Sequence, residues 1–203
     1  MRMELQVDPE ARALIFDLDG TLSDSLPVHL AVWRRLGDAY GFVFDEKLVY
    51  DMTGMPTIYF ARKVVEENHL QMAPVELVRL KQQAFLESGH LIRPIVPVIR
   101  LARQSHGRLP MSVGTGANRR SARMQLERLG IAGLFDHVVT SDDVRLHKPE
   151  PETFLTCARL MGVAPPACQV FEDGELGLTA ARTAGMIVTD VRPFLGNGNG
   201  VAG

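Results

Sequence analysis

The segment Ala13-Leu14-Ile15-Phe16-Asp17-Leu18-Asp19-Gly20-Thr21 is the most informative one about the fold. Its first four residues form an uninterrupted apolar run that stops at acidic residues. The run is too short for a helix and is typical of a strand buried on both faces. Side chains alternate along an extended chain, so Asp17 and Asp19 leave the sheet on the same side. In open α/β sheets, ligands bind at this carboxyl edge.

Two carboxylates this close repel each other unless a cation or a shared proton compensates their charge. A hard, oxygen-seeking ion such as Mg²⁺ would do so. The alternative is a solvated acidic turn in which Gly20 supplies an unusual backbone angle. The motif alone does not decide between these two interpretations, because short motifs also match by chance.

The rest of the chain extends the sheet. Four further segments have the length and composition of strands: residues 111–113, 138–140, 169–171 and 187–189. Helix-like stretches of about the length that a βαβ crossover needs lie between them, at residues 117–129, 150–161 and 176–184. A glycine follows each of these stretches, as expected just past a helix end. The alternation predicts an α/β fold with a Rossmann-like parallel sheet.

A helical segment interrupts this alternation after the first strand. Residues 28–40, 57–68 and 75–88 read as helices, and Pro94 to Pro97 marks the return to the sheet. We therefore predict an α/β catalytic core made of residues 1–25 and 95–203, with a helical cap inserted at residues 26–94. The glycine- and asparagine-rich stretch 196–200 is expected to be flexible.

Three more strands of the predicted sheet end in polar residues. Thr115 follows the second strand, and with nearby backbone N–H groups at a helix start it could bind phosphate. Lys148 follows the third strand, and Glu172 and Asp173 end the fourth. Taken singly, Lys148 is more typical of a solvated surface lysine, and the acidic pair could equally be a helix cap. Together the four strands deliver Asp/Asp, Thr, Lys and Glu/Asp to one edge of the sheet.

This ordered set resembles the haloacid dehalogenase superfamily of phosphohydrolases over nearly the full length of the chain. Phe171-Glu172-Asp173-Gly174-Glu175-Leu176-Gly177 and Ala184-Gly185-Met186 look like the subgroup that contains β-phosphoglucomutase and small sugar phosphatases. Val113-Gly114-Thr115-Gly116, His147-Lys148-Pro149 and Met161-Gly162-Val163 are similar to its bacterial fructose-1-phosphatase-like branch.

The resemblance implies a two-step phosphoryl transfer. Asp17 would be the nucleophile that forms an aspartyl-phosphate, and Asp19 would protonate the leaving alcohol and later activate water. Thr115 would hydrogen-bond a phosphoryl oxygen, and Lys148 would neutralise charge on the phosphoryl group and on Asp17. The Lys148–Pro149 bond is expected to be cis, as relatives of this type suggest.

The same resemblance implies Mg²⁺ as the cofactor. The ion would be held by the carboxylates of Asp17 and Asp173 and by the backbone carbonyl of Asp19, with Glu172 nearby. It would screen a negative nucleophile from a negative phosphate. In the motif at residues 171–177, Gly174 occupies a position where family members frequently have Ser or Thr, so that hydroxyl is missing here.

Residues expected to bind the substrate come from both parts of the chain: Thr115, Gly116, Lys148, His29, Gly54 and Lys81. His29 matches a position that faces the active site in mutase-like members, although a surface histidine on a helix is an equal alternative. Gly54-Met55-Pro56-Thr57 resembles the cap loop that reaches the substrate. Lys81 is expected to point at the same pocket.

Three functions are compatible with these residues. The first is a Mg²⁺-dependent phosphatase acting on small sugar phosphates such as fructose-1-phosphate. The second is a β-phosphoglucomutase, which needs an arginine for the distal phosphate shortly after the cap-loop glycine. Here the first cation after Gly54 is Arg62, about a helical turn too far, which favours hydrolysis. The third is a phospho-acceptor signalling domain without turnover, which the helical insertion disfavours.

Composition excludes other classes of function. A net charge of −2 over 203 residues leaves no basic excess for binding nucleic acid or an anionic membrane. No apolar run approaches the roughly 18 residues that span a bilayer, and acidic residues interrupt the start of the chain where a signal peptide is apolar. Cys157 and Cys168 are typical of core thiols in a reducing compartment. We expect a cytoplasmic monomer whose partner is a small phosphorylated sugar.

Overall fold

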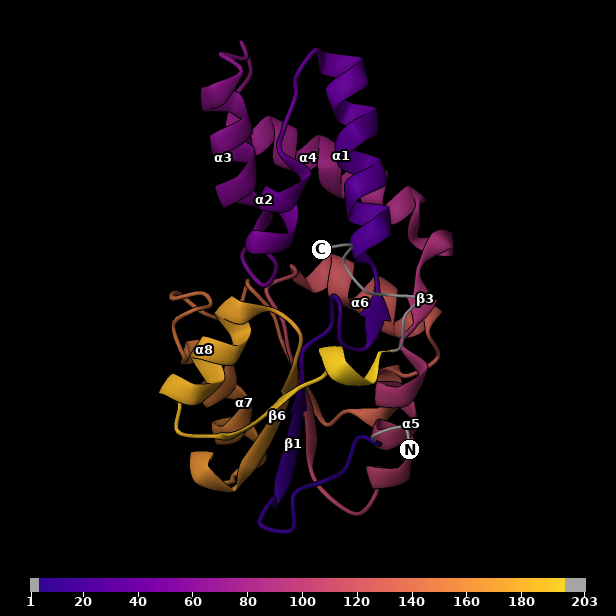
Figure 1. Ribbon diagram of the computed structural model, residues 1–203, viewed down its shortest axis with the longest axis vertical. Helices are drawn as coiled ribbons and strands as arrows, with labels where there is room; N and C mark the ends of the chain where they lie inside the picture. Colours follow the sequence, from indigo (N-terminus) through magenta and orange to yellow (C-terminus); the bar gives the residue numbers. More distant parts are fainter. Residues whose placement is uncertain (1–3, 196–203) are drawn as a thin grey trace.

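The computed structural model describes residues 4–195, so the predicted flexible stretch 196–200 lies outside the described residues. A five-stranded parallel sheet in the order β5-β4-β1-β6-β7 forms its lower half (Figure 1). The strands are β1 (Ala13–Phe16), β4 (Met111–Gly114), β5 (His137–Val139), β6 (Cys168–Glu172) and β7 (Ile187–Asp190). The α/β fold and the five predicted parallel strands are confirmed, with β1 in the centre.

Helices cover both faces of the sheet because its central strand is apolar on both sides. Leu14 and Phe16 pack into one hydrophobic cluster, and Ala13 and Ile15 pack into another. The first cluster includes residues of α5 and α6, and the second includes residues of α7 and α8. These helices are α5 (Val96–Ser105), α6 (Arg119–Arg128), α7 (Glu152–Met161) and α8 (Glu175–Thr183).

Four helices stand above the carboxyl edge of the sheet and form what we call the helical block (Figure 1). They are α1 (Leu26–Tyr40), α2 (Glu46–Asp51), α3 (Thr57–Glu67) and α4 (Pro74–Glu87). Their apolar faces meet in a separate cluster that includes Trp33, Phe42, Phe60 and Leu77. The block therefore buries apolar surface among its own helices, and a smaller cluster packs Val28 and Phe85 against Met124 of α6.

Two short strands connect the helical block to the sheet. β2 (Ser23–Asp24) enters the block and β3 (Arg93–Pro94) leaves it, and they pair antiparallel. The two segments that connect the sheet to the helical block therefore lie side by side. Short 3₁₀ turns complete the structure at Gly89–Leu91, Ala132–Leu134, Pro165–Ala167 and Arg192–Phe194.

Two helices were not predicted from the sequence. α5 begins at Val96 and contains Pro97 in its first turn, where the missing N–H of proline costs no hydrogen bond. The prolines that we read only as a boundary therefore also start a helix. α2 has six residues, too few for a clear periodicity, and begins where the Asp45 side chain accepts from the Lys47 N–H.

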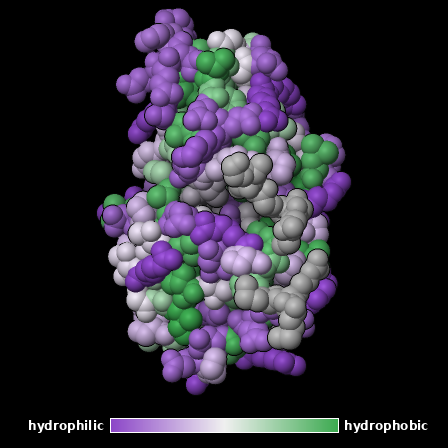
Figure 2. Space-filling view, in the orientation of Figure 1, coloured by the Kyte–Doolittle hydropathy of each residue, from purple (hydrophilic) through white to green (hydrophobic). Residues whose placement is uncertain are grey.

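The outer surface on one face of the molecule is mixed in character. Hydrophilic side chains predominate, and the hydrophobic ones form separate small patches (Figure 2). In the part of the chain that the structure describes, no helix has the length and hydropathy needed to cross a membrane.

Candidate active site

A buried lysine joins two acidic strand ends at the carboxyl edge of the sheet. Phe16 of β1 lies opposite Phe171 of β6, and this register places Asp17 beside Glu172. Lys148 Nζ lies 2.6 Å from Asp17 Oδ1 and 2.6 Å from Glu172 Oε2. The side chain of Lys148 is 1% exposed, so the alternative of a solvated surface lysine, which this residue taken singly suggests, is wrong. The Lys148–Pro149 bond is cis, as predicted.

Asp173 adds a third carboxylate to this site. Oxygen atoms of Asp17, Glu172 and Asp173 all lie within 4.8 Å of one another. The Thr21 hydroxyl donates a hydrogen bond of 2.7 Å to Asp173 Oδ1. This contact gives the carboxylate a hydroxyl partner, although Gly174 replaces the frequent Ser or Thr of the motif.

The charges of these groups do not balance within the protein. Burial and the charge of Glu172 raise the pKa of Asp173 to about 8 and raise the pKa of Asp17 well above its usual range. The carboxylates of Asp17 and Glu172 outweigh burial and raise the pKa of Lys148. One lysine charge thus faces three carboxylates, and a hard divalent cation fits this set of oxygen donors.

Two glycines make this close packing possible. A Cβ on Gly20, whose φ is +94°, would lie 2.1 Å from Asp173 Oδ2. A Cβ on Gly177 would lie 1.9 Å from Glu172 Oε2. Glu172 Oε1 also accepts hydrogen bonds from the N–H groups of Asp173 and Gly174 at 3.1 and 2.9 Å, and Oε2 accepts from Lys148. Both carboxylate oxygens are therefore hydrogen-bonded. Glu172 therefore anchors Lys148 and is placed close to the other carboxylates.

The carboxylate of Asp19 points away from this group. Its Oδ1 accepts from Ser25 Oγ at 2.5 Å and Gln125 Nε2 at 2.9 Å, and it lies 3.2 Å from His29 Nε2. Burial raises the pKa of Asp19, but hydrogen bonding to His29, Ser25 and Gln125 outweighs burial and holds this pKa below its usual range. The family resemblance implies that Asp19 would offer a cation its backbone carbonyl and not this carboxylate.

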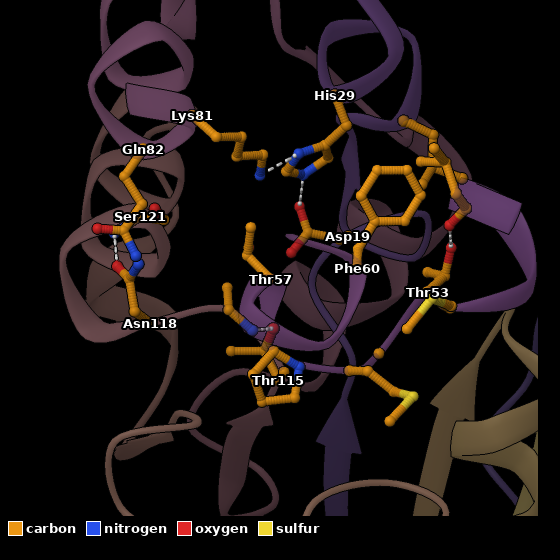
Figure 3. A pocket seen from close by; sticks show the side chains of 18 of the residues that line it. Asp19, His29, Thr53, Thr57, Phe60, Lys81, Gln82, Thr115, Asn118 and Ser121 are labelled. Atoms are coloured by element: carbon orange, nitrogen blue, oxygen red, sulfur yellow. Dashed lines mark hydrogen bonds and ion pairs between the residues drawn. The ribbon is translucent and has the colours of Figure 1, made fainter. Parts of the chain in front are cut away.

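His29 and Lys81 extend this hydrogen-bond chain into the helical block (Figure 3). Lys81 Nζ lies 2.8 Å from His29 Nδ1, and the His29 ring stacks on Phe85 with centroids 4.1 Å apart. An ammonium can only donate and a carboxylate can only accept, so His29 accepts at Nδ1 and donates from Nε2. Burial and the charge of Lys81 lower the pKa of His29, so it holds Asp19 as a neutral donor.

The loop between α2 and α3 closes over the sheet edge. A Cβ on Gly116 would lie 2.0 Å from the Gly54 carbonyl oxygen, and a Cβ on Gly54 would lie 3.1 Å from the Lys148 side chain. Thr115 is buried beneath, where its hydroxyl accepts from the Ala117 N–H at 3.0 Å. The hydroxyl hydrogen of Thr115 is thereby left to donate toward the cavity.

Most of the predicted site residues line a cavity between the sheet edge and the helical block (Figure 3). Its lining includes Asp17, Asp19, His29, Gly54, Lys81, Thr115 and Gly116. The interpretation of His29 as a surface histidine is therefore wrong. Lys148, Glu172 and Asp173 are not part of this lining; Lys148 contacts Asp17, and carboxylate oxygens of Glu172 and Asp173 lie within 4.8 Å of one of Asp17. Arg62 is exposed against Tyr59, and among residues 4–195 no arginine lines the cavity.

Sequence reasoning missed several polar residues of this cavity. Gln82 on α4 lies near Asn118 and Ser121 of the core (Figure 3). Gln125 is fully buried on the side of α6 that carries Ala122 and Leu126. An amide within that otherwise apolar stripe is the signal that could have identified it.

Comparison with known proteins places the chain among phosphatases. It is 42% identical over 183 residues to the fructose-1-phosphate phosphatase YqaB of Escherichia coli, covering 88% of this chain and 95% of that relative. It is 30% identical to a phosphorylated carbohydrates phosphatase of Thermotoga maritima, covering 86% and 82% of the two chains. It is 28% identical to the β-phosphoglucomutase of Bacillus subtilis, covering 91% and 86%.

Solved structures share the fold. The β-phosphoglucomutase of Clostridium difficile superposes with a TM-score of 0.77 at 24% identity, covering 89% of this chain and 84% of that one. CbbY of Rhodobacter sphaeroides, solved in complex with phosphate, gives a TM-score of 0.78 at 20% identity, covering 89% and 86%. The model of the haloacid dehalogenase-like hydrolase family matches residues 14–191, so the chain belongs to the haloacid dehalogenase-like hydrolases.

Proposed function

We propose that the protein is a Mg²⁺-dependent phosphatase that hydrolyses small sugar phosphates, such as fructose-1-phosphate, through an aspartyl-phosphate. The observation that carries this proposal is the buried Asp17–Lys148–Glu172 contact at the floor of a cavity that Asp19 also lines. The 42% identity to a fructose-1-phosphate phosphatase supports the choice of substrate class.

In the first step, an oxygen of Asp17 attacks phosphorus and the bond between phosphorus and the sugar oxygen breaks. Asp19 must carry a proton when the substrate is bound, although the donors to its Oδ1 favour the carboxylate in the free protein, and it gives that proton to the leaving oxygen. In the second step Asp19 takes a proton from water, the resulting hydroxide attacks the phosphoryl group, and inorganic phosphate leaves while Asp17 is restored. Thr115 and Lys148 donate hydrogen bonds to the phosphoryl oxygens and offset their charge.

Asp17 and Asp173, with the backbone carbonyl of Asp19, would hold a Mg²⁺ ion, with Glu172 nearby. The fit rests on three carboxylates within 4.8 Å that share one lysine charge. When bound, the ion supplies positive charge between the nucleophile and the phosphate. Gly20 and Gly177 leave the room that these side chains need.

The cavity favours a neutral leaving group with hydroxyls. Its only lysine among residues 4–195, Lys81, is held against His29, and no arginine of the described chain reaches a second phosphate. Gln82, Asn118 and Ser121 offer amide and hydroxyl groups, while Trp33 and Phe60 offer apolar surface. This lining supports hydrolysis of a monophosphate over a mutase reaction that holds a bisphosphate.

The proposed function also assigns roles to the two parts of the chain. Residues 26–94 serve as the cap and residues 1–25 and 95–203 as the catalytic core, since the helical block has a cluster of its own and two paired strands connect it to the sheet. One chain contains all the residues named for the reaction, so a monomer suffices.

The test is a panel of hexose, pentose and polyol monophosphates with Mg²⁺. We expect release of inorganic phosphate, fastest from compact substrates such as fructose-1-phosphate. With β-glucose-1-phosphate and a trace of the bisphosphate, faster formation of glucose-6-phosphate than of free phosphate would establish the mutase instead. Stoichiometric labelling without turnover would establish a signalling domain.

A further inference from the structure

Gln125 is a buried polar residue that the reaction as described does not use. It lies on α6 with no exposed surface, beside Ala122 and Leu126. A buried amide is costly unless it is hydrogen-bonded. Its Nε2 donates to Asp19 Oδ1 at 2.9 Å, and its Oε1 accepts from Ser23 Oγ at 2.5 Å. Both ends of the amide are therefore satisfied, and one of them holds Asp19.

The donors around Asp19 all converge on one oxygen. Ser25, Gln125 and His29 contact Oδ1, whereas Oδ2 has no hydrogen-bond partner among residues 4–195. Asp19 lines the cavity. The arrangement thus fixes one oxygen to the protein and leaves the other to exchange a proton with the substrate.

Gln125 differs from the other two donors in where it comes from. Ser25 precedes α1 and His29 is on α1, so both belong to the entrance of the helical block. Gln125 comes from the helix that packs on the sheet, and its second bond reaches Ser23 on the connecting strand β2. Both of its partners, Asp19 and Ser23, lie outside helices α1 to α4.

We propose that Gln125 is a positioning residue that fixes Asp19 from the core side with Oδ2 directed at the leaving oxygen. This inference rests on the proposed function, in which Asp19 protonates that oxygen. A general acid typically contributes about 10²–10⁴-fold when the leaving group is a poor one. A leaving group that departs as a stable anion needs little general-acid catalysis. The role of Gln125 should therefore depend on the leaving group.

The experiment compares kcat/KM for fructose-1-phosphate and for p-nitrophenyl phosphate, because kcat/KM reports the steps through departure of the leaving group. Gln125→Met keeps the volume but removes both hydrogen bonds. We expect it to lower kcat/KM for fructose-1-phosphate by at least about 10-fold and to change that for p-nitrophenyl phosphate by less than about 3-fold. Gln83→Met, which alters an exposed glutamine on α4, should change neither.

Asp19→Asn should reproduce this selectivity more strongly, and adding Gln125→Met to it should have no further effect on the ratio of the two rates. Equal losses on both substrates, or no loss on either, would overturn the role of Gln125 while leaving the phosphatase intact. A wild-type protein that hydrolyses neither substrate would instead overturn the proposed function. Should Gln125→Met fold poorly, Gln125→Leu also removes the donor to Asp19, and the same selective loss is expected.

Discussion

At the scale of a single residue, the buried ammonium of Lys81 contacts His29 in the cavity and lowers the free energy of unfolding. Its side chain is 5% exposed, donates to His29 at 2.8 Å and lies 4.8 Å from the Phe85 ring centre. Burial lowers the pKa of Lys81 to about 8. In the unfolded chain the pKa of this lysine returns to about 10.5, so the unfolded state binds the proton more tightly between these values.

We predict that Lys81→Met stabilises the fold at pH 7 by about 1–3 kcal/mol, because the cost of burying a charge is removed. The advantage should shrink as pH rises from 8 to 10.5, where the wild-type lysine is already neutral in the folded state. Urea unfolding at pH 7 and pH 10 measures this, with the exposed Lys63→Met as a control. A variant that is less stable than wild type at pH 7 would contradict the account.

Some of the site residues could be predicted from the sequence because they follow strands. Asp17, Thr115, Lys148 and Asp173 all come directly or shortly after a predicted strand, and parallel strands end at one edge of the sheet. Gln125 could not be predicted in this way. Its contact with Asp19 spans 106 positions and depends on how α6 packs on the sheet.

At the scale of elements, the loop between α2 and α3 and the turn after β4 form a tight contact. The Gly54 carbonyl oxygen lies 2.0 Å from where a Cβ on Gly116 would be, and both partners are backbone atoms. Neither atom can yield as a flexible side chain would. The closed position of this loop therefore depends on glycine at position 116.

We predict that Gly116→Ala displaces the loop and lowers kcat/KM for sugar phosphates by about 10²-fold, the typical cost of misplacing a positioning group by about 1 Å. Thermal unfolding with and without Mg²⁺ should show that this variant binds the ion as the wild-type protein does. Gly133→Ala is the matched control, since a Cβ there meets nothing within 4 Å. Activity of Gly116→Ala within about 3-fold of wild type would show that loop contact is not required.

The elements themselves were predictable to different degrees. The strands and α7 are continuous apolar or periodic segments with clear ends, and sequence alone located them. α2 is a single short helix stabilised by contacts within the helical block, which its own six residues do not reveal. α5 was missed because Pro97 was taken only as part of the boundary between cap and core, although proline is favoured in a first helical turn.

At the scale of the whole molecule, a divalent cation should stabilise the fold. It would bind Asp17 and Asp173, with the Asp19 carbonyl, and folding brings the Asp17 carboxylate to within 4.8 Å of those of Glu172 and Asp173. At 100 times its Kd, a ligand of the folded state adds about 2.7 kcal/mol. For a chain of this length we expect a rise in Tm of roughly 5–10 °C.

Differential scanning calorimetry with millimolar Mg²⁺ and with EDTA tests this. Asp173→Asn should abolish most of the shift, whereas the exposed Asp38→Asn should keep it. An unchanged Tm in the wild-type protein at every Mg²⁺ concentration would contradict the proposed set of ligands.

Asp17 should become phosphorylated during turnover, and a rapid acid quench with a ³²P-labelled sugar phosphate detects this intermediate. Label should appear on the peptide that contains Asp17 and decay as phosphate is released. Asp17→Asn should fold, take up no label and lose several orders of magnitude in activity. Retention by that variant of more than about a tenth of the wild-type rate, a loss of less than about 1.4 kcal/mol, would contradict the account.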